Sequence, residues 1–438
     1  MRFVSLLLFS NLLLLCFSPP LSAWGSHYLI IDRVLEHSSA AFAGREVDAE
    51  ELEDFVSKEA GGLKEVFDGY YRWLEVKGAK RFKPQILDAN VAKKRPLQEF
   101  LKAARLRPAH RFYSVRRLLP NETAKFGFVD RFRVYPYLEK REMGRYFFEN
   151  VKGKKISVRS ILTTYVDEPD WGMDHELWNI PEYGYGTQPF GNPRGESSKA
   201  PFHMLFRHEN FFVKTFAPEM STGSMLPERV ELFRRLSEFA GKTGHPFWEY
   251  RFAAWVCHYV QDIGQPYHSK AVPSAGYYYY LKFALNSAEN RAKIKKETTQ
   301  IVANRHFIYE DFVAYGLYKS YATQDPIFEN LKAYLSSGDP FLTGVNSVDD
   351  LLSKEGELAA DHSPLIDSTI VKVFGKKRTT DPTYDLERDP EYEISGVVRG
   401  IDSEKGNELA RETGRDFRIT AQSTRTVLML IGVYGNKK

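Results

Sequence analysis

The chain has 438 residues, of which 43% are hydrophobic and 14% aromatic, enough for one large or two modest domains with a substantial core. Its formal net charge is only +4. It has two cysteines, and Cys16 lies in the N-terminal apolar run, so an internal disulfide framework is excluded once that run is removed. Core packing, bound metal or both must then stabilise the fold.

The N-terminus is typical of a secretory signal peptide. Arg2 precedes an apolar run over residues 4–17, and Leu-Ser-Ala ends at Ala23. Because the run is too short for a membrane span, we expect residues 1–23 to be removed by cleavage after Ala23. This predicts a secreted or periplasmic protein.

The hydrophobic pattern predicts a mainly α-helical fold. Helices are expected at 24–38, 48–75 with an interruption at Gly61-Gly62, 97–119, 155–166, 226–241, 248–264, 286–303 and 305–320. After about residue 325 the pattern indicates short helices, a turn-rich stretch at 377–393 and a helix at 403–415. The apolar stretch 427–433 is too short to span a bilayer.

Positive charge gathers in residues 93–117, which contain nine Lys or Arg and one acidic residue, Glu99. Such a run can contact anionic lipid head groups or nucleic-acid phosphates. A solvated helix face is the other interpretation.

The stretch His-Tyr-Val-Gln-Asp-Ile-Gly-Gln-Pro-Tyr-His, residues 258–268, is the most informative one. The apolar sequence before it predicts a buried helix, on which His258 and Asp262 share one face because they are four residues apart. Pro266 disfavours helical geometry in the residue before it, so the helix ends there and His268 lies in the following turn. Two nitrogen ligands and one oxygen ligand are what a buried zinc ion needs.

Three further clusters contain donors for a metal ion. Each also has a simpler interpretation, as a helix-surface pair, a solvated acidic turn, or a structural Trp beside a surface His. The clusters are His306 with Glu310, Asp167 and Asp170 with His203 and His208 beyond a Gly- and Pro-rich loop, and Trp24 with His27.

Together these residues resemble the zinc-dependent phospholipase C and single-strand nuclease superfamily. Its motif His-x-x-x-Asp-x-x-Gln-Pro-x-His matches residues 258–268, and its mature chains begin with tryptophan, as this one would at Trp24. The resemblance covers about 24–40 and 160–320. It implies a multi-helix hydrolase domain over 24–325 that includes an unmatched helical insertion, 41–155. Residues 326–438 would form a helical extension of unknown role.

The resemblance also implies three zinc ions. His258 and Asp262 would bind the first, together with Asp167 or Asp170 and with His203 or His208. The second would be bound by His268, His306 and Glu310, and the third by Trp24, His27 and the bridging Asp262. The upstream aspartate, Asp167 or Asp170, would orient a water molecule or act as a base.

The implied activity is hydrolysis of a phosphate ester by a secreted phosphoric diester hydrolase. Glu310, where the nucleases have aspartate, favours a phospholipase C that acts on phospholipid at a membrane surface. A nuclease acting on single-stranded nucleic acid is the alternative, since Tyr277 and Tyr278 could stack on bases as well as hold a cationic head group. A zinc-stabilised binding protein without catalysis is the third possibility.

Overall fold

The computed structural model describes residues 24, 26–36, 42, 44–77, 84–138, 144–323, 325–336 and 341–434. Within these ranges the chain is mainly helical, which confirms the predicted fold class. The expected signal peptide, 1–23, lies outside the described residues. None of the helices in the described ranges is long and apolar enough to cross a membrane.

Helix α12 (Pro246–Ile263) lies at the centre of the molecule, and each of its residues from Phe247 to Ile263 is buried. Its N-terminal proline is already in helical geometry and lacks the amide hydrogen that would have no partner there. A helix that is apolar around its circumference has to be covered on every side. The helices that pack on it include α11 (Leu226–Lys242), α7 (Val158–Tyr165), α20 (Ser403–Leu430) and α13 (Pro266–Ser269).

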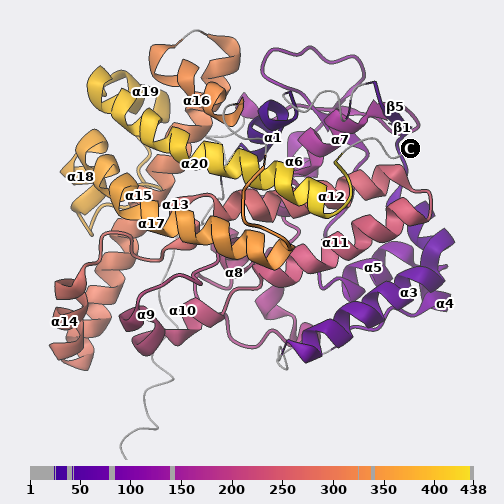
Figure 1. Cartoon of the computed structure of the whole chain (residues 1–438), viewed down its shortest axis with the longest axis horizontal. Coiled ribbons are helices and arrows are strands. Elements are labelled where there is room, and N and C mark those ends of the chain that lie inside the picture. Colours follow the sequence, from indigo (N-terminus) through magenta and orange to yellow (C-terminus); the bar gives the residue numbers. More distant parts are fainter. Residues whose placement is uncertain are drawn as a thin grey trace, which may run out of the picture.

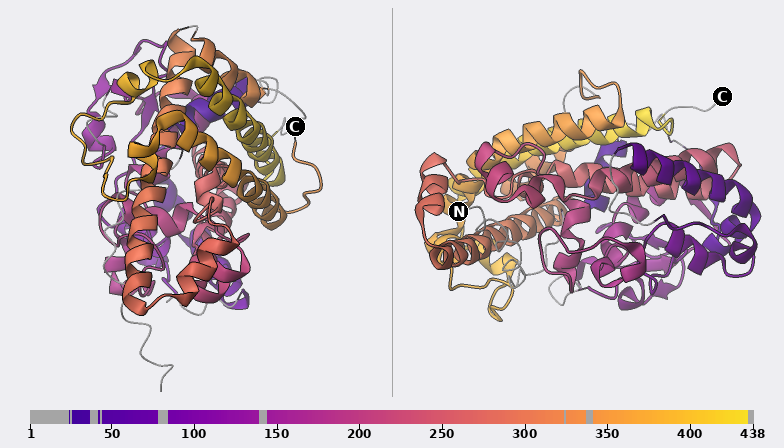
Figure 2. Two further views of the ribbon diagram at one scale, coloured as in Figure 1. Left: turned by 90° about the vertical axis from the view of Figure 1, so that its left-hand side faces the viewer. Right: turned by 90° about the horizontal axis from the view of Figure 1, so that it is seen from below.

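The C-terminal region lies directly against these central helices. Helices α17 (Val348–Phe374) and α20 lie side by side and form one outer layer of the molecule (Figures 1 and 2). Helix α20 also contacts α12, α1 (His27–Glu36) and α16 (Pro326–Ser336). Its Phe417 packs against Trp24 at a ring distance of 5.3 Å. One hydrophobic core therefore includes both the region of the predicted hydrolase domain and the region of the predicted extension.

Residues 44–157 add helix α3 (Leu52–Val76), short helices α4 (Ala89–Ala92), α5 (Pro96–Ala103) and α6 (Arg131–Val134), and two small antiparallel sheets. Strands β1 (Glu46–Asp48) and β5 (Lys155–Ser157) pair with each other. The other sheet has the order β2 (Val115–Arg117), β4 (Phe148–Asn150) and β3 (Phe128–Val129). Its inner face packs on α7, where the Arg117 amide donates to Thr164 Oγ1 over 3.0 Å.

Several predicted elements differ from the structure. The expected helix 97–119 ends at Ala103 and its second half is extended into β2. Helix α3 continues through Gly61-Gly62, and its one non-helical residue is Glu59. The two helices expected at 286–303 and 305–320 are one helix, α15 (Ala288–Ala322).

The remaining short helices form the periphery. They are α9 (Phe211–Phe216), α10 (Pro218–Thr222), α14 (Tyr277–Leu285), α18 (Lys376–Thr380) and α19 (Ile394–Arg399). The short helix α8 (Ala200–His203) is buried and contacts α12. The loop after α7 contains four 3₁₀ turns, the first of which is Glu168–Trp171.

Candidate metal centre

The motif at 258–268 has the local geometry that its sequence predicts. His258 Nε2 lies 3.3 Å from Asp262 Oδ2, one helical turn apart on α12. The chain then turns at Gly264, where a larger residue would force the Thr420 side chain of α20 to shift, because a Cβ atom would lie 2.0 Å from Thr420 Oγ1. The Gln265 side chain accepts from the Tyr267 amide and caps α13. That short helix directs His268 towards Asp262, with 3.5 Å between Nδ1 and Oδ1.

Three groups of potential metal ligands converge around this motif. In each group one donor atom per residue lies within 4.8 Å of the others, and every residue is buried. The first group is Asp170, His203 and His258; the second is His268, His306 and Glu310; the third is His27, His258 and Asp262.

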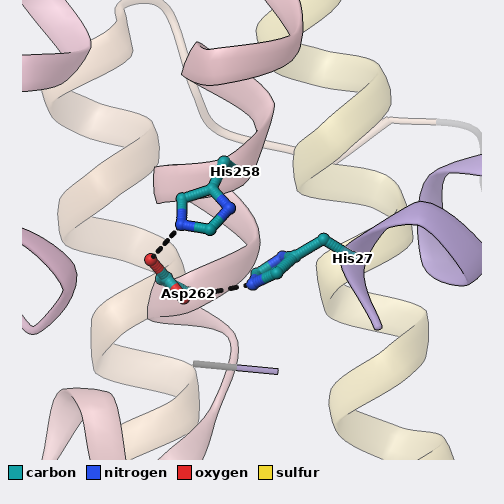
Figure 3. Close-up of side chains that lie close together, drawn as sticks. All are labelled: His27, His258 and Asp262. Atoms are coloured by element: carbon teal, nitrogen blue, oxygen red, sulfur yellow. Dashed lines mark ion pairs between the residues drawn. The ribbon is translucent and has the colours of Figure 1, made fainter. Parts of the chain in front are cut away.

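Asp262 is the residue that connects the three groups. Its Oδ1 atom lies 3.4 Å from His27 Nε2, and its Oδ2 atom lies 2.9 Å from His203 Nδ1. In Figure 3, His27 reaches the carboxylate from α1, while His258 lies above it on α12. A carboxylate with imidazoles beside both oxygens is suited to bridge two cations.

The buried donors are suited to metal ions because many of them have no hydrogen-bond partner among the described residues. Such atoms occur in all three groups: His27 Nε2, Asp262 Oδ1, His258 Nδ1, Glu310 Oε2 and both ring nitrogens of His268. A buried polar atom without a partner costs roughly 1–3 kcal/mol. Bound cations facing the donors would remove part of this cost, and two nitrogens and one oxygen per group is a donor set that zinc prefers.

The protonation states of His258, His306 and Asp262 favour cation binding. By contrast, burial alone would lower the pKa of His203, but the neighbouring carboxylates raise it to about 9. Burial lowers the pKa of His258 and of His306 to about 3, so both rings are neutral near pH 7, the form that binds metal. Burial alone would raise the pKa of Asp262, but the imidazoles of His258 and His203 hold it well below its ordinary value. Glu310 differs, because burial raises its pKa to about 7.

Between the two predicted aspartates, the structure brings Asp170 to the first group. Its Oδ1 atom lies 3.7 Å from His203 Nδ1 and 3.8 Å from His258 Nε2. Asp167 forms a buried ion pair with Arg117 and accepts from the Tyr28 amide, so it is directed away from the three groups.

Between the two predicted histidines, the structure brings His203 to the first group. Its other ring nitrogen, Nε2, lies 3.5 Å from Asp174 Oδ2, and Asp174 is held by Arg229 at 2.7 Å and by the Tyr259 hydroxyl at 2.6 Å. Carboxylates in this position orient metal-binding imidazoles. His208 is in none of the three groups; it lies beside α17 near Gly356.

Three polar residues of the site were not among the predicted ones. The Gln261 carbonyl oxygen lies 3.0 Å from His27 Nδ1, and the Gln265 amide donates to Glu310 Oε1 over 3.0 Å. Lys199 is buried, and its Nζ atom lies 2.5 Å from Asp170 Oδ1. Both glutamines lie within residues 258–268, so the sequence could have indicated them as site residues. Lys199 stands in a loop with no such signal.

Trp24 is buried three residues before His27 and packs against Tyr309 of α15 as well as Phe417. Of the two tyrosines predicted to bind substrate, Tyr278 is 79% exposed on α14. The side chain of Tyr277 lies outside the described part of the chain. The structure therefore does not bring Tyr278 into the buried groups.

Comparisons with models of protein families, with curated proteins and with solved structures found no match to this chain.

Proposed function

We propose that this protein is a zinc-dependent phosphoric diester hydrolase with three metal ions, acting on phospholipid in the manner of a phospholipase C. The observation that carries the proposal is the convergence of three buried donor groups around Asp262. Residues from α1, the acidic turn, α8, α12, α13 and α15 all contribute, although up to 283 residues separate them in the sequence, from His27 to Glu310.

A purely structural role explains this arrangement poorly. Internal polar clusters normally satisfy their own hydrogen bonds. Here both nitrogens of His268 and one oxygen of Asp262 have no hydrogen-bond partner among the described residues. We infer that these donors are kept for cations.

When bound, clustered zinc would supply Lewis acidity and would lower the pKa of a water molecule towards neutrality. The protein's residues would prepare the site for that chemistry. Asp174 orients His203, and Gln261 orients His27. Asp170 would serve as the aspartate that orients water. Burial alone would raise its pKa, but Lys199 and the neighbouring histidines hold the pKa below the ordinary value, so the group stays an ionised acceptor.

Phospholipid is the preferred substrate because of the second group. Its carboxylate is Glu310, the residue type that the resemblance assigns to the phospholipase C branch, and its Oε1 atom lies 2.7 Å from His306 Nε2 and 3.5 Å from His268 Nε2. The geometry thus brings together the three residues of the predicted second zinc site.

The test compares hydrolysis of two substrates by protein that begins at Trp24 and is loaded with zinc. Short-chain phosphatidylcholine and single-stranded DNA are offered separately, each with and without a chelator. His268→Gln is the site variant. His362→Gln is its matched control, because His362 is also buried but pairs with Asp416 outside the three groups.

Chelator-sensitive release of phosphocholine that His268→Gln abolishes and His362→Gln retains is the expected result. Release of nucleotides without release of phosphocholine would show that the substrate is nucleic acid and not phospholipid. Full zinc loading without hydrolysis of either substrate would overturn the enzymatic proposal and favour a zinc-stabilised binding protein.

A further inference from the structure

The three-stranded sheet β2-β4-β3 has one face packed on the core and one outer face, on which Glu149 at the centre is buried and Phe128 at the edge is exposed. Phe148 pairs with Arg117 and Val129 and is fully buried on the face that packs towards α7. On the other face, Glu149 pairs with Arg116 on one side and Phe128 on the other. Directly opposed residues of antiparallel strands share a face, so Arg116, Glu149 and Phe128 all belong to the outer face.

Three phenylalanines extend along this outer face. The Phe147 carbonyl accepts from the Leu118 amide and so continues the pairing of β2 with β4, which places Phe147 on the face of Glu149 by the strand period of two. Phe126 precedes β3, and its amide donates to the Glu149 carboxylate of that face. Phe126, Phe128 and Phe147 are 39%, 69% and 44% exposed, and we call them the phenylalanine face. Another exposed ring, Phe132, follows on α6. Large apolar side chains gathered in solvent mark an interaction site more often than single ones do.

Basic residues lie beside the phenylalanine face and are frequent in the two segments that carry it. Residues 122–134 and 145–155 contain seven Lys or Arg and three Asp or Glu. The Arg131 guanidinium lies 5.1 Å from the ring centre of Phe147, and Lys154 Nζ lies 5.4 Å from that of Phe126. Long cationic side chains of this kind can place their charge at phosphate level while their stems cover apolar surface.

The carboxylates nearby are engaged by the protein itself. Glu149 accepts from Arg116 at 2.5 Å and from the amides of Lys125 and Phe126. Arg116 also pairs with Glu122 at 2.9 Å. The negative charge on this side of the sheet is therefore partly neutralised within the sheet.

We propose that the phenylalanine face binds the surface of an anionic phospholipid bilayer. The rings would enter the boundary between head groups and acyl chains, and the surrounding Lys and Arg would contact lipid phosphates. This inference concerns a surface on the 41–155 region, separate from the metal centre, and it does not depend on the proposed hydrolysis.

This assignment differs from the one that the sequence indicated, the basic run 93–117. In the structure that run is not one surface. Arg105 and Arg117 are buried, and Arg117 neutralises Asp167 inside the protein. The exposed aromatic rings lie after it.

Nucleic acid fits the phenylalanine face less well than lipid does. Bases stack on free ring faces, but Arg131 and Lys154 already lie over the rings of Phe147 and Phe126. Phenylalanine also offers no hydrogen-bonding group for a base edge. Single-stranded DNA is therefore one arm of the test.

The test measures flotation of the full chain beginning at Trp24 with vesicles of phosphatidylcholine alone or with one-third phosphatidylserine. Binding of a single-stranded DNA oligonucleotide is measured in parallel. The variants are Phe128→Glu and the combination of Phe126→Ser, Phe128→Ser and Phe147→Ser. Phe211→Glu is the matched control, because Phe211 is 74% exposed on α9, outside the phenylalanine face. Thermal unfolding confirms that each variant is folded.

We expect the protein to float with the phosphatidylserine vesicles, less so at high salt, and the variants to lower the partition coefficient about tenfold or more. Phe211→Glu should bind as the unmodified protein does. Equal flotation of Phe128→Glu, or no flotation of the unmodified protein, would overturn the proposal, and DNA binding lost in the same variants would assign the surface to nucleic acid. Because flotation does not require hydrolysis, an inactive enzyme can still pass this test.

Discussion

The substitution Asp262→Asn removes the charge that connects the three donor groups while keeping the shape of the side chain. Four imidazole nitrogens lie near this carboxylate, those of His203 at 2.9 Å, His258 at 3.3 Å, His27 at 3.4 Å and His268 at 3.5 Å. An amide retains only one oxygen for ligation, and its nitrogen would face an imidazole or a cation.

The expected loss follows from these contacts. Changing a residue that only orients a metal ligand costs about 10–100-fold in affinity. Asp262 would face the cation directly, so we expect a loss of at least about 100-fold, or ~2.8 kcal/mol at 1.4 kcal/mol per factor of ten. Asp262 is a member of the third group, and it contacts His203 of the first group. The substitution should therefore weaken both groups, whereas His306 and Glu310 of the second group are unchanged. Bound zinc should fall from about three ions to about one per chain.

The assay is zinc content after dialysis against a weak chelator, together with the rate of hydrolysis. Asp416→Asn is the matched control, because Asp416 is buried and lies 2.7 Å from an imidazole, that of His362, outside the three groups. Three retained ions with an unchanged rate in Asp262→Asn would refute the reasoning, as would an equal zinc loss in Asp416→Asn.

The remaining predictions concern the folded core. Glu168→Gln should lower the free energy of unfolding in urea by about 3–5 kcal/mol, because it leaves the buried Arg251 cation without its paired charge, and the exposed Glu238→Gln should change it by less than ~1 kcal/mol. Burial alone would raise the pKa of Glu168, but Arg251 holds it below 4.5, so this stabilisation is complete above about pH 4.5 and is lost as the pH falls below it. Urea titrations from pH 7 to 3 should show that loss, and a Glu168→Gln protein with the same pH profile as the unmodified protein would contradict it. Cys257 is buried and burial raises the pKa of its thiol, so iodoacetamide should label it only after unfolding; rapid labelling of the folded protein would contradict its placement in α12.

Local sequence was sufficient for the centre of the site. The mostly apolar and aromatic sequence of α12 predicted a buried helix, and four-residue spacing fixed how His258 and Asp262 face each other. The choice between Asp167 and Asp170 needed the tertiary structure. Both stand at one 3₁₀ turn, and Arg117, which lies 50 residues before Asp167, pairs with it and leaves Asp170 for the first group.

The C-terminal helices show a second limit of sequence patterns. Helix α20 extends to Leu430, although the sequence predicted a helix only to 415. Between Phe417 and Val427 its buried face contains mainly small residues, most of them polar. Thr424 can be buried because its hydroxyl donates a hydrogen bond to the Thr420 carbonyl, one helical turn earlier, over 2.7 Å. Gly414 admits the Tyr334 ring, which a Cβ atom there would meet at 2.2 Å. Hydrophobic periodicity does not detect a face built in this way.

The most direct test of the account is the zinc content of the protein that begins at Trp24, measured by elemental analysis after zinc loading and dialysis. Three donor groups predict about three zinc ions per chain, all of them removed by a strong chelator. A protein that stays folded with one zinc ion or none would contradict the metal centre and the function proposed from it.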